Sequence, residues 1–468
     1  MKDFTTISRV YFIGIGGIGM SALARYFLHK QSMVSGYDKT PTPLSKQLES
    51  EGAIIHYEDN AQMLDKEAEL VIYTPAIPKD HKEFNWFRDH NYEIAKRSDA
   101  LSQITKSSFN ICIAGTHGKT TISAMVAHIL RDTGFGCNAF LGGISANYNT
   151  NFWHSNNNVD VVEADEYDRS FLKLSPDVAV ISAMDADHLD IYGTVENMRE
   201  AFVEFAGKLK PDGLLLTRFG IPDGRFSAAN HIRYSLQNSA ADVYASNITM
   251  HNGGYEYDVM AETWMIEKVK LNMGGMHNVE NTVAAIAIAR HLEIDTDKIK
   301  KAVQNFKGVK RRFEYVIGPS EAEKLKNNVV FIDDYAHHPE ELKALIKSAE
   351  SLLGKRKCTV IFQPHLFTRT RDFAKEFAES LDLADEILLL PVYPARELPI
   401  EGVTSELILK EMENQNASAV SKEQLLEYVG GNYLQTMPQN SYGKLLITAG
   451  AGNIDQLIEP IKKVLLNN

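Results

Sequence analysis

Residues 109–121 read Phe-Asn-Ile-Cys-Ile-Ala-Gly-Thr-His-Gly-Lys-Thr-Thr, and this stretch decides the fold. The apolar run 109–114 predicts a buried strand, the two glycines predict a tight turn, and the run from Ile122 predicts a helix. A strand that enters a helix through a glycine turn is typical of a triphosphate site, because backbone N–H groups at the helix N-terminus bind phosphate. In such a site the Lys119 ammonium adds a mobile charge, and the Thr120 hydroxyl is a ligand for Mg²⁺.

The loop is a short G-x-x-G-K-T form of the Walker A motif. A full motif has a glycine five residues before Gly118, and this chain has Ile113 there. The alternative interpretation is a glycine-rich turn with a solvated lysine. The position between a strand and a helix favours the phosphate loop, because the motif needs that context for its backbone donors to converge.

Length, composition and charge limit the class of protein. The 468 residues are too many for one hydrophobic core and suggest about three domains. The net charge of −12 argues against nucleic acid as a partner, because phosphate-backbone binding needs a basic surface. No apolar run reaches membrane-spanning length, the N-terminus lacks the shape of a signal peptide, and the three cysteines lie far apart. We therefore expect a cytoplasmic protein with reduced cysteines and no membrane partner.

Three segments each have the pattern of an α/β unit, and we place their boundaries at 1–107, 108–307 and 308–468. Strands that alternate with helices predict parallel sheets. Alternating residues at 264–271 suggest antiparallel strands within the irregular stretch 226–273. The other expected strands cover residues 10–13, 33–37, 70–73, 159–162, 178–181, 329–332, 359–362, 386–390 and 444–448, and the expected helices include 20–30 and 339–353.

A second glycine loop lies near the N-terminus. Gly14, Gly16 and Gly19 form G-x-G-x-x-G after the first strand, and Asp38 ends the next strand. By itself this pattern predicts a dinucleotide site. The nicotinamide interpretation is weakened because a second phosphate loop follows within one domain length. The diphosphate of another nucleotide would fit the same backbone donors, and the glycines could also serve only the packing of helix on strand.

Two strand ends in the second segment are acidic. Four carboxylates follow the strand at 159–162, within residues 163–168, and the strand at 178–181 leads into Asp185, Asp187, His188 and Asp190. Mg²⁺ prefers oxygen ligands and usually takes one or two carboxylates plus phosphate. Together with the phosphate loop these strand ends favour a metal-assisted triphosphate site. The alternatives are solvated acidic loops and, for His188 alone, a structural hydrogen bond.

Three further motifs could carry chemistry. Asn278 and Asn281 share one face of an apolar helix, where a pair could bind a base and a phosphate although capping explains one of them. The run 310–314 offers guanidinium groups for a phosphate, or a basic surface. The run 333–339 has paired aspartates and paired histidines before a helix that begins with proline. Zinc is an alternative there, but adjacent histidines rarely both reach one ion.

Taken together, these segments resemble the Mur ligases, the ATP-dependent amide-forming enzymes of bacterial peptidoglycan synthesis. The resemblance covers nearly the whole chain. It rests on nine motifs in order, which are 14–21, 115–121, 163–166, 187–188, 277–281, 311–313, 333–339, 363–370 and 450–453.

The resemblance implies a fold of three domains and a role for each motif. The N-terminal domain would be Rossmann-like and bind the UDP substrate, the central domain would be P-loop ATPase-like, and the C-terminal domain would be Rossmann-like. The UDP-substrate residues implied are Gly14, Gly16, Gly17, Gly19, Met20 and Asp38. The ATP residues implied are Gly115, Thr116, His117, Gly118, Lys119, Thr120, Thr121, Asn278, Asn281, Arg312 and Asp334. The metal ligands implied are Thr120, Glu163 and His188, and the catalytic residues implied are Lys119, His188, Arg312, Asp334, His337 and His338.

The resemblance also implies an activity. We expect ATP and Mg²⁺ to serve the joining of L-alanine to the lactyl carboxylate of UDP-N-acetylmuramate, in the cytoplasm, by a monomer or weak homodimer. One alternative is a recycling ligase that attaches the L-alanyl-γ-D-glutamyl-diaminopimelate tripeptide to the same UDP sugar, and a remote one is a nicotinamide-dependent oxidoreductase. A catalytically inactive homologue is disfavoured because Lys119, Glu163 and Asp334 are all present, as is His188.

Overall fold

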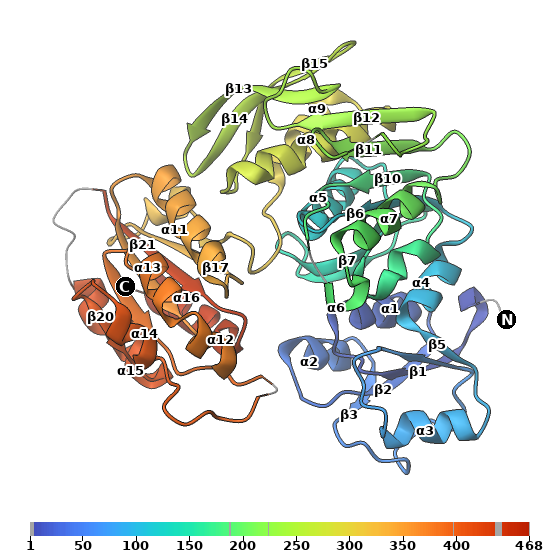
Figure 1. The fold of residues 1–468 in the computed structure, drawn as a ribbon, viewed down its shortest axis with the longest axis horizontal. Coiled ribbons are helices and arrows are strands. Elements are labelled where there is room, and N and C mark those ends of the chain that lie inside the picture. The colour runs from blue at the N-terminus through green and yellow to red at the C-terminus, as the bar shows by residue number, and fades with distance from the viewer. Residues whose placement is uncertain (1–3, 187–188, 223, 396, 436–441, 468) are drawn as a thin grey trace. The chain divides into compact units, whose positions relative to one another are not determined.

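Three β-sheets with helices packed on them make up the chain (Figure 1). The computed structural model describes residues 4–186, 189–222, 224–395, 397–435 and 442–467. The predicted α/β class is confirmed, since nearly all strand pairs with a recorded register run parallel. Among the described residues, no helix has both the length and the apolar character needed to cross a membrane.

The first sheet has five parallel strands in the order β3-β2-β1-β4-β5. This order places the first strand at the centre, so the loop after β1 lies at the middle of the sheet's carboxyl edge. The predicted strands at 10–13, 33–37 and 70–73 are confirmed. The elements are η1 Phe4–Thr6, β1 Arg9–Ile13, α1 Ile18–His29, β2 Met33–Tyr37, α2 Pro43–Ser50, β3 Ile54–His56, β4 Leu70–Tyr73, α3 Lys82–Asp89, β5 Ile94–Lys96 and α4 Arg97–Thr105.

The second sheet has ten strands in the order β15-β14-β13-β12-β11-β10-β6-β9-β7-β8. Its central strands β6 and β10 are buried on both faces, as their apolar runs predict. The strands are β6 Phe109–Ala114, β7 Asn138–Ser145, β8 Thr150–Trp153, β9 Val159–Glu163, β10 Val178–Ile181, β11 Leu214–Arg218, β12 Asn230–Ser235, β13 Val243–His251, β14 Gly254–Ala261 and β15 Met265–Leu271. The helices are α5 Lys119–Asp132, η2 Tyr167–Lys173, α6 Leu189–Tyr192, α7 Val195–Ala206, α8 Met276–His291 and α9 Thr296–Asn305.

The stretch 226–273 is only partly the antiparallel region that its alternation predicts. Strand β12 pairs in parallel with both β11 and β13, so this part of the prediction is wrong. Strands β13 and β14 are joined by Asn252 and Gly253, both with positive φ, and a two-residue turn of this kind joins antiparallel strands. The alternating residues at 264–271 therefore predict the strand β15 correctly, but they do not predict how β12 pairs.

The third sheet has six strands in the order β16-β17-β21-β18-β19-β20, and only β16 runs antiparallel to its neighbour. All four strands expected in this segment are present, whereas the short strands β16 and β20 were not predicted. The strands are β16 Glu314–Ile317, β17 Val329–Asp334, β18 Lys357–Phe362, β19 Glu386–Leu389, β20 Ala417–Ala419 and β21 Lys444–Ala449. The helices are α10 Pro319–Ala322, α11 Pro339–Leu353, α12 Phe367–Asp372, α13 Ala374–Leu381, α14 Glu406–Glu411, α15 Lys422–Tyr428, η3 Val429–Tyr433, η4 Asn453–Leu457 and α16 Ile458–Leu466.

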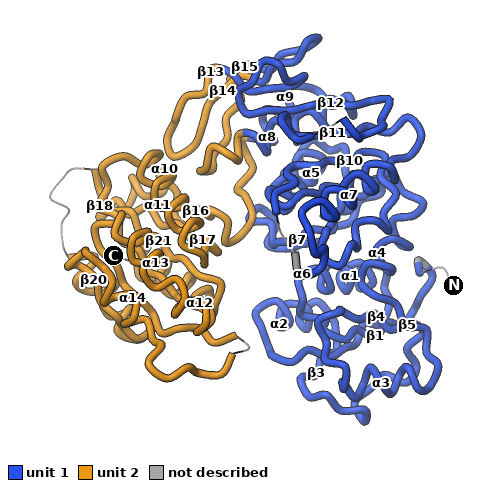
Figure 2. Tube along the Cα trace, in the orientation of Figure 1, with its two compact units in different colours: residues 1–246, 259–266, 280–303 blue, residues 247–258, 267–279, 304–468 orange. Residues whose placement is uncertain are grey.

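The chain forms two compact units, coloured separately in Figure 2. The first contains residues 1–246, 259–266 and 280–303, and the second contains residues 247–258, 267–279 and 304–468. Within the first unit one apolar cluster spans two sheets, because the Tyr26 ring of α1 lies 5.9 Å from Phe140 and 6.1 Å from Phe152. The domain boundaries at 107 and 307 stay predictions.

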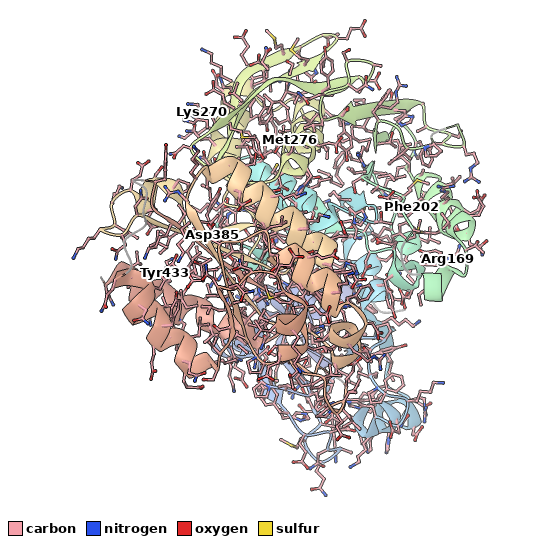
Figure 3. All side chains as sticks on the ribbon, turned by 60° about the vertical axis from the view of Figure 1, so that its left-hand side comes forward. Arg169, Phe202, Lys270, Met276, Asp385 and Tyr433 are labelled. Carbon is pink, nitrogen blue, oxygen red and sulfur yellow. The ribbon has the colours of Figure 1, made fainter. Side chains whose placement is uncertain are left out.

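Buried apolar side chains form the core clusters of the described chain, whose side chains are drawn on the ribbon in Figure 3. Phe202 of α7, labelled in Figure 3, packs edge-on against Phe171 with ring centroids 5.3 Å apart. In the second unit Asp385 accepts a hydrogen bond from the backbone N–H of Cys358 at 2.7 Å, which fixes the start of β18. All three cysteines are free and buried, as expected of reduced core residues.

Candidate active site

The loop 115–118 has the backbone conformation that a phosphate loop requires. Gly115 and Gly118 have φ values of +133° and +83°, in the region that favours glycine. A Cβ on Gly115 would lie 2.2 Å from Ser182 Oγ, so no side chain fits there. Helix α5 begins at Lys119 without a side-chain cap at Gly118, which leaves the N–H groups of its first turn for an anion.

Lys119 is held on this loop by two oxygens. Its Nζ donates to the Gly115 carbonyl and to Glu166 Oε1, both at 2.7 Å. The Glu166 side chain is fully buried, and the lysine side chain is 15% exposed. Burial raises the pKa of Glu166, and the neighbouring Lys119 ammonium opposes that shift. The lysine is thus oriented by a buried carboxylate to which the sequence assigned no role.

Thr120 and Glu163 meet at the end of β9. Thr120 Oγ1 donates to Glu163 Oε1 at 3.0 Å, and Gly142 N donates to Glu163 Oε2 at 3.1 Å. The structure therefore brings together two of the three expected metal ligands, a hydroxyl and a carboxylate of the kind Mg²⁺ takes. The third, His188, lies outside the described residues. Within the described ranges no group of three or more His, Cys, Asp or Glu side chains could hold a metal ion.

Two cations of the protein neutralise part of the acidic run 163–168. Arg97 Nη2 lies 3.2 Å from Asp165 Oδ2, and Lys119 pairs with Glu166. Like charges this close repel one another, and cationic side chains from α4 and α5 offset two of them. Arg97 is a site residue that the sequence did not reveal, since it lies 68 positions from its partner.

The remaining residues of the predicted phosphate loop pack against neighbouring strand ends. Thr116 N donates to Ala183 O, and Thr116 Oγ1 accepts from Asp185 N, both at 3.1 Å. A Cβ on Gly118 would lie 2.9 Å from Asn281 Oδ1, so Asn281 borders the loop. In the second unit, the Asn278 amide instead donates to the Gly274 carbonyl at 2.6 Å. His117 is exposed and Thr121 is buried.

Hydrogen bonds within the first glycine loop, and from the loop to Tyr37 and Asp38, fix its conformation. Gly14 N and Ile15 N donate to Tyr37 O, Gly17 N donates to Gly14 O, and Gly16 N donates to Asp38 Oδ2 at 2.7 Å. The Asp38 carboxylate therefore stabilises the conformation of the loop. The donors that remain for a diphosphate are in the first turn of α1, at residues 18–20, because the first N–H groups of a helix have no partner inside it.

A pocket of about 270 Å³ lies in the first unit between this loop and the second sheet. Residues 17–20 line it, as do Gly142 and Glu163. Arg97 reaches it from α4, close enough that a Cβ on Gly19 would lie 2.6 Å from Arg97 Nη1. The two glycine loops predicted from the sequence therefore serve one region, since Glu163 also contacts Thr120 of the second loop.

The predicted arginine motif of the second unit contains one half-buried and one exposed arginine. Arg311 Nε lies 3.3 Å from Asp333 Oδ2, and its guanidinium lies over the Tyr335 ring at 5.1 Å. Arg312 is exposed. Asp334 accepts from Phe313 N at 2.6 Å and from Ala336 N at 2.8 Å, so it fixes the loop that carries Arg312. Burial raises the pKa of Asp333 to about 7 and that of Asp334 to about 6.

The paired histidines face different neighbours. His337 Nδ1 donates a hydrogen bond to Tyr335 O at 2.9 Å, and the His337 ring lies 5.9 Å from the His365 ring. The His338 ring packs on Phe373 at 5.1 Å. Both backbone N–H groups donate to Glu341 Oε2, which caps α11. The zinc alternative gains no support from this part of the described chain.

Comparisons with known proteins identify the family of this chain. The chain matches, in order, the sequence models for the Mur ligase family, catalytic domain (residues 9–109), the Mur ligase middle domain (113–289) and the Mur ligase, glutamate ligase domain (311–452). With relatives more than 40% identical over its whole length, the chain belongs to the Mur ligase family. The nicotinamide alternative is left without support.

The most informative relatives within the family share one name. The chain is 46% identical to a UDP-N-acetylmuramate–L-alanine ligase of Cytophaga hutchinsonii, over 98% of this chain and 97% of the relative. It is also 46% identical to that of Parabacteroides distasonis, over 99% and 98%. Among solved structures, the UDP-N-acetylmuramate-alanine ligase of Thermotoga maritima superposes with a TM-score of 0.79, at 28% identity and 98% coverage of both chains. The murein peptide ligase of Psychrobacter arcticus shares the fold, with a TM-score of 0.67 at 21% identity.

Proposed function

We propose that this chain joins L-alanine to the lactyl carboxylate of UDP-N-acetylmuramate and cleaves ATP to ADP and phosphate. The observation that carries the proposal is the pocket of the first unit, which lies between the first glycine loop and Glu163, next to the ATP loop. A site where two phosphate loops converge suits the transfer of a phosphoryl group from one nucleotide to the substrate of another. The full-length similarity to L-alanine ligases supports the choice of substrates.

The chemistry has two steps. A carboxylate is a poor acylating agent, so its oxygen first attacks the γ-phosphorus of ATP in line, and ADP leaves. The L-alanine amine then attacks the carbonyl carbon of the acyl phosphate, phosphate leaves with the former C–O bonding pair, and the amine loses a proton. The protein's part is to position these groups and neutralise charge. We place the reaction in the cytoplasm.

Residues of the first unit would bind and orient both nucleotides. The first turn of α1 would donate to the UDP diphosphate, with Asp38 holding the glycine loop in shape. Lys119 would exchange one of its oxygen partners for a phosphate oxygen. Thr120 and Glu163 would hold Mg²⁺ together with His188, and the ion, when bound, neutralises phosphate charge. Asn281 borders the same loop.

Residues of the second unit would serve ATP and the amine, as the family resemblance implies. Arg312 would contact phosphate, and Asp334 would act through the loop that carries it. His337 and His338 would serve the reacting groups in roles that the resemblance leaves unseparated; the His337 ring lies 5.9 Å from the His365 ring, and the His338 ring packs on Phe373.

Phosphate release and product mass test the proposal. The purified chain is given UDP-N-acetylmuramate, ATP and, in turn, L-alanine, glycine, L-serine or the L-alanyl-γ-D-glutamyl-diaminopimelate tripeptide. We expect L-alanine to be the best substrate and glycine and L-serine to be poorer ones, because burying one methyl contributes only about 1 kcal/mol. In a mixture of equal concentrations, product dominated by the tripeptide would show that the chain is the recycling ligase instead.

A further inference from the structure

We propose that Asn151 is a positioning residue that fixes the first glycine loop relative to Glu163, and so sets the alignment of the substrate carboxylate with the γ-phosphoryl. The inference rests on the proposed function. Asn151 lies on β8, in the hairpin formed with β7, and its side chain is fully buried. Its contacts cross from the second sheet to helix α1 of the first sheet, within one compact unit.

The side-chain amide of Asn151 forms its hydrogen bonds with residues of α1. Its Nδ2 donates to the Ile18 carbonyl at 2.5 Å and to Ser21 Oγ at 3.0 Å, and its Oδ1 accepts from Arg25 Nη1. These three partners occupy one face of α1, at positions 18, 21 and 25. A buried amide that lost such partners would carry a desolvation penalty of about 1–3 kcal/mol, so the contact also fixes the register of the hairpin on the helix.

Arg25 extends the contact to a third element. It is only 6% exposed, and its Nε and Nη2 donate to the two carboxylate oxygens of Glu51 at 2.7 and 3.1 Å. Glu51 follows helix α2 directly. The guanidinium is therefore held in a fixed orientation from both sides, because a bidentate carboxylate leaves it little freedom to rotate.

The other strand of the same hairpin, β7, contacts Glu163 at the end of β9. Gly142 of β7 donates its N–H to Glu163 Oε2 at 3.1 Å, and a Cβ on Gly142 would lie 2.4 Å from that carboxylate. Thus β8 contacts Ile18 through Asn151, and β7 contacts Glu163 through Gly142. Ile18 and Glu163 both line the 270 Å³ pocket. The hairpin is the element that fixes the separation between them.

This separation matters because in-line attack needs close alignment of carboxylate and phosphorus. A misplacement of about 1 Å remote from the chemistry can lower a rate by roughly 10²-fold. Asn151 contacts the backbone of Ile18 and does not itself line the pocket. It therefore acts through the loop, which predicts a loss in the chemical step with little change in the binding of each nucleotide alone.

Three variants of the full chain test the proposal. Asn151→Ala removes the side-chain hydrogen bonds of residue 151 to α1. Asn151→Asp keeps an acceptor for Arg25 and loses the donor to Ile18 and Ser21. Asn138→Ala is the matched control, because Asn138 lies on β7 of the same hairpin and, among the described residues, its side chain bonds to Asp160 of β9 and to the backbone N–H of Ser155. For each variant we would measure kcat, the KM values for ATP and L-alanine, the Kd values for UDP and ADP, and the melting temperature.

For Asn151→Ala we expect kcat to fall at least about tenfold, with KM and Kd values within about threefold of wild type. Asn151→Asp keeps the acceptor for Arg25, so it should lose less melting temperature than Asn151→Ala while still losing kcat, and it decides the test if the alanine variant fails to fold. Asn138→Ala should lose melting temperature but keep kcat. Wild-type kcat in folded Asn151→Asp would overturn the inference alone. Absence of product from wild type would overturn the proposed function and this inference with it.

Discussion

Replacing Lys119 with alanine should damage both catalysis and stability, and the two effects can be separated. From the sequence alone this variant is expected to keep its fold intact, because the lysine serves phosphate and not a core. The structure predicts otherwise, since Lys119 is the partner of a fully buried carboxylate, Glu166. Removing the lysine leaves that carboxylate without its charge partner inside the protein.

The expected cost follows from the burial of the pair. Breaking a buried ion pair by removing one partner costs roughly 3–5 kcal/mol, and the 15% exposure of Lys119 places this case near about 3 kcal/mol. For a compact unit of this size, a loss of about 3 kcal/mol in the free energy of unfolding lowers the melting temperature by about 6 °C. Catalysis should fall by about 150-fold, since loss of one charge contact to a transferring phosphoryl group costs on the order of 3 kcal/mol.

The stability loss should depend on pH with a definite sign. Burial already raises the pKa of Glu166, and without the opposing Lys119 charge it rises further. A carboxyl group whose folded-state pKa lies above its unfolded value contributes stability at low pH that is lost as pH rises through the folded pKa. The melting temperature of Lys119→Ala should therefore lie closer to wild type at about pH 5 than at about pH 8.

Scanning calorimetry at the two pH values and phosphate-release assays check these expectations. The double variant Lys119→Ala/Glu166→Gln should recover most of the stability and none of the activity, because it removes the buried charge but not the need for the lysine. Lys173→Ala is the control, since Lys173 forms a half-exposed ion pair with Asp99 in the same unit and should cost less than about 1 kcal/mol. Equal melting temperatures for wild type and Lys119→Ala at both pH values would refute the reasoning.

Three further predictions concern metal, nucleotide and pH. Glu163→Gln and His188→Ala should each raise the Mg²⁺ concentration needed for half-maximal rate and lower kcat, and an unchanged Mg²⁺ dependence in both would make the acidic strand ends solvated loops. In calorimetry the full chain should bind UDP and show no preference for NAD(H); tighter binding of NAD(H) than of UDP would reverse the assignment of the first glycine loop. Burial raises the pKa of Asp333 to about 7, so the stability that its protonated form contributes is lost as pH rises through about 7, and Asp333→Asn should flatten that decline in thermal unfolding curves.

The parts of the fold that the sequence predicts are those in which a local pattern decides the structure. Strand β10 is buried along its whole length and β6 is buried after Phe109, so their apolar runs, interrupted in β6 only by Asn110, are sufficient to identify them. Strand β12 reads Asn-His-Ile-Arg-Tyr-Ser and has one buried end, so no run marks it. The hairpin β7–β8 was missed for a similar reason, because two glycines interrupt β7.

In the candidate site too, the residues of a local motif were predictable from the sequence, and those that depend on distant contacts were not. The phosphate loop was predictable because its glycines, lysine and threonine are consecutive and their backbone donors converge locally. Glu166 and Arg97 could not be assigned roles, because each acts through a partner 47 or 68 positions away that only the tertiary fold brings close. Contacts at that separation depend on how two sheets pack, and a single sequence carries no local signal for it.

Three acidic residues that the family resemblance places in ligand-binding sites accept hydrogen bonds from backbone N–H groups of neighbouring loops. Asp38 accepts from Gly16, Asp334 accepts from Phe313 and Ala336, and Glu163 accepts from Gly142. Each carboxylate follows or ends a strand and fixes the loop beside it, so charge and loop geometry are coupled at all three places. An asparagine at 38 or 334 retains an acceptor for the loop, whereas an alanine does not. A larger loss of activity in the alanine variant than in the asparagine variant would therefore measure loop geometry, and equal losses would measure charge.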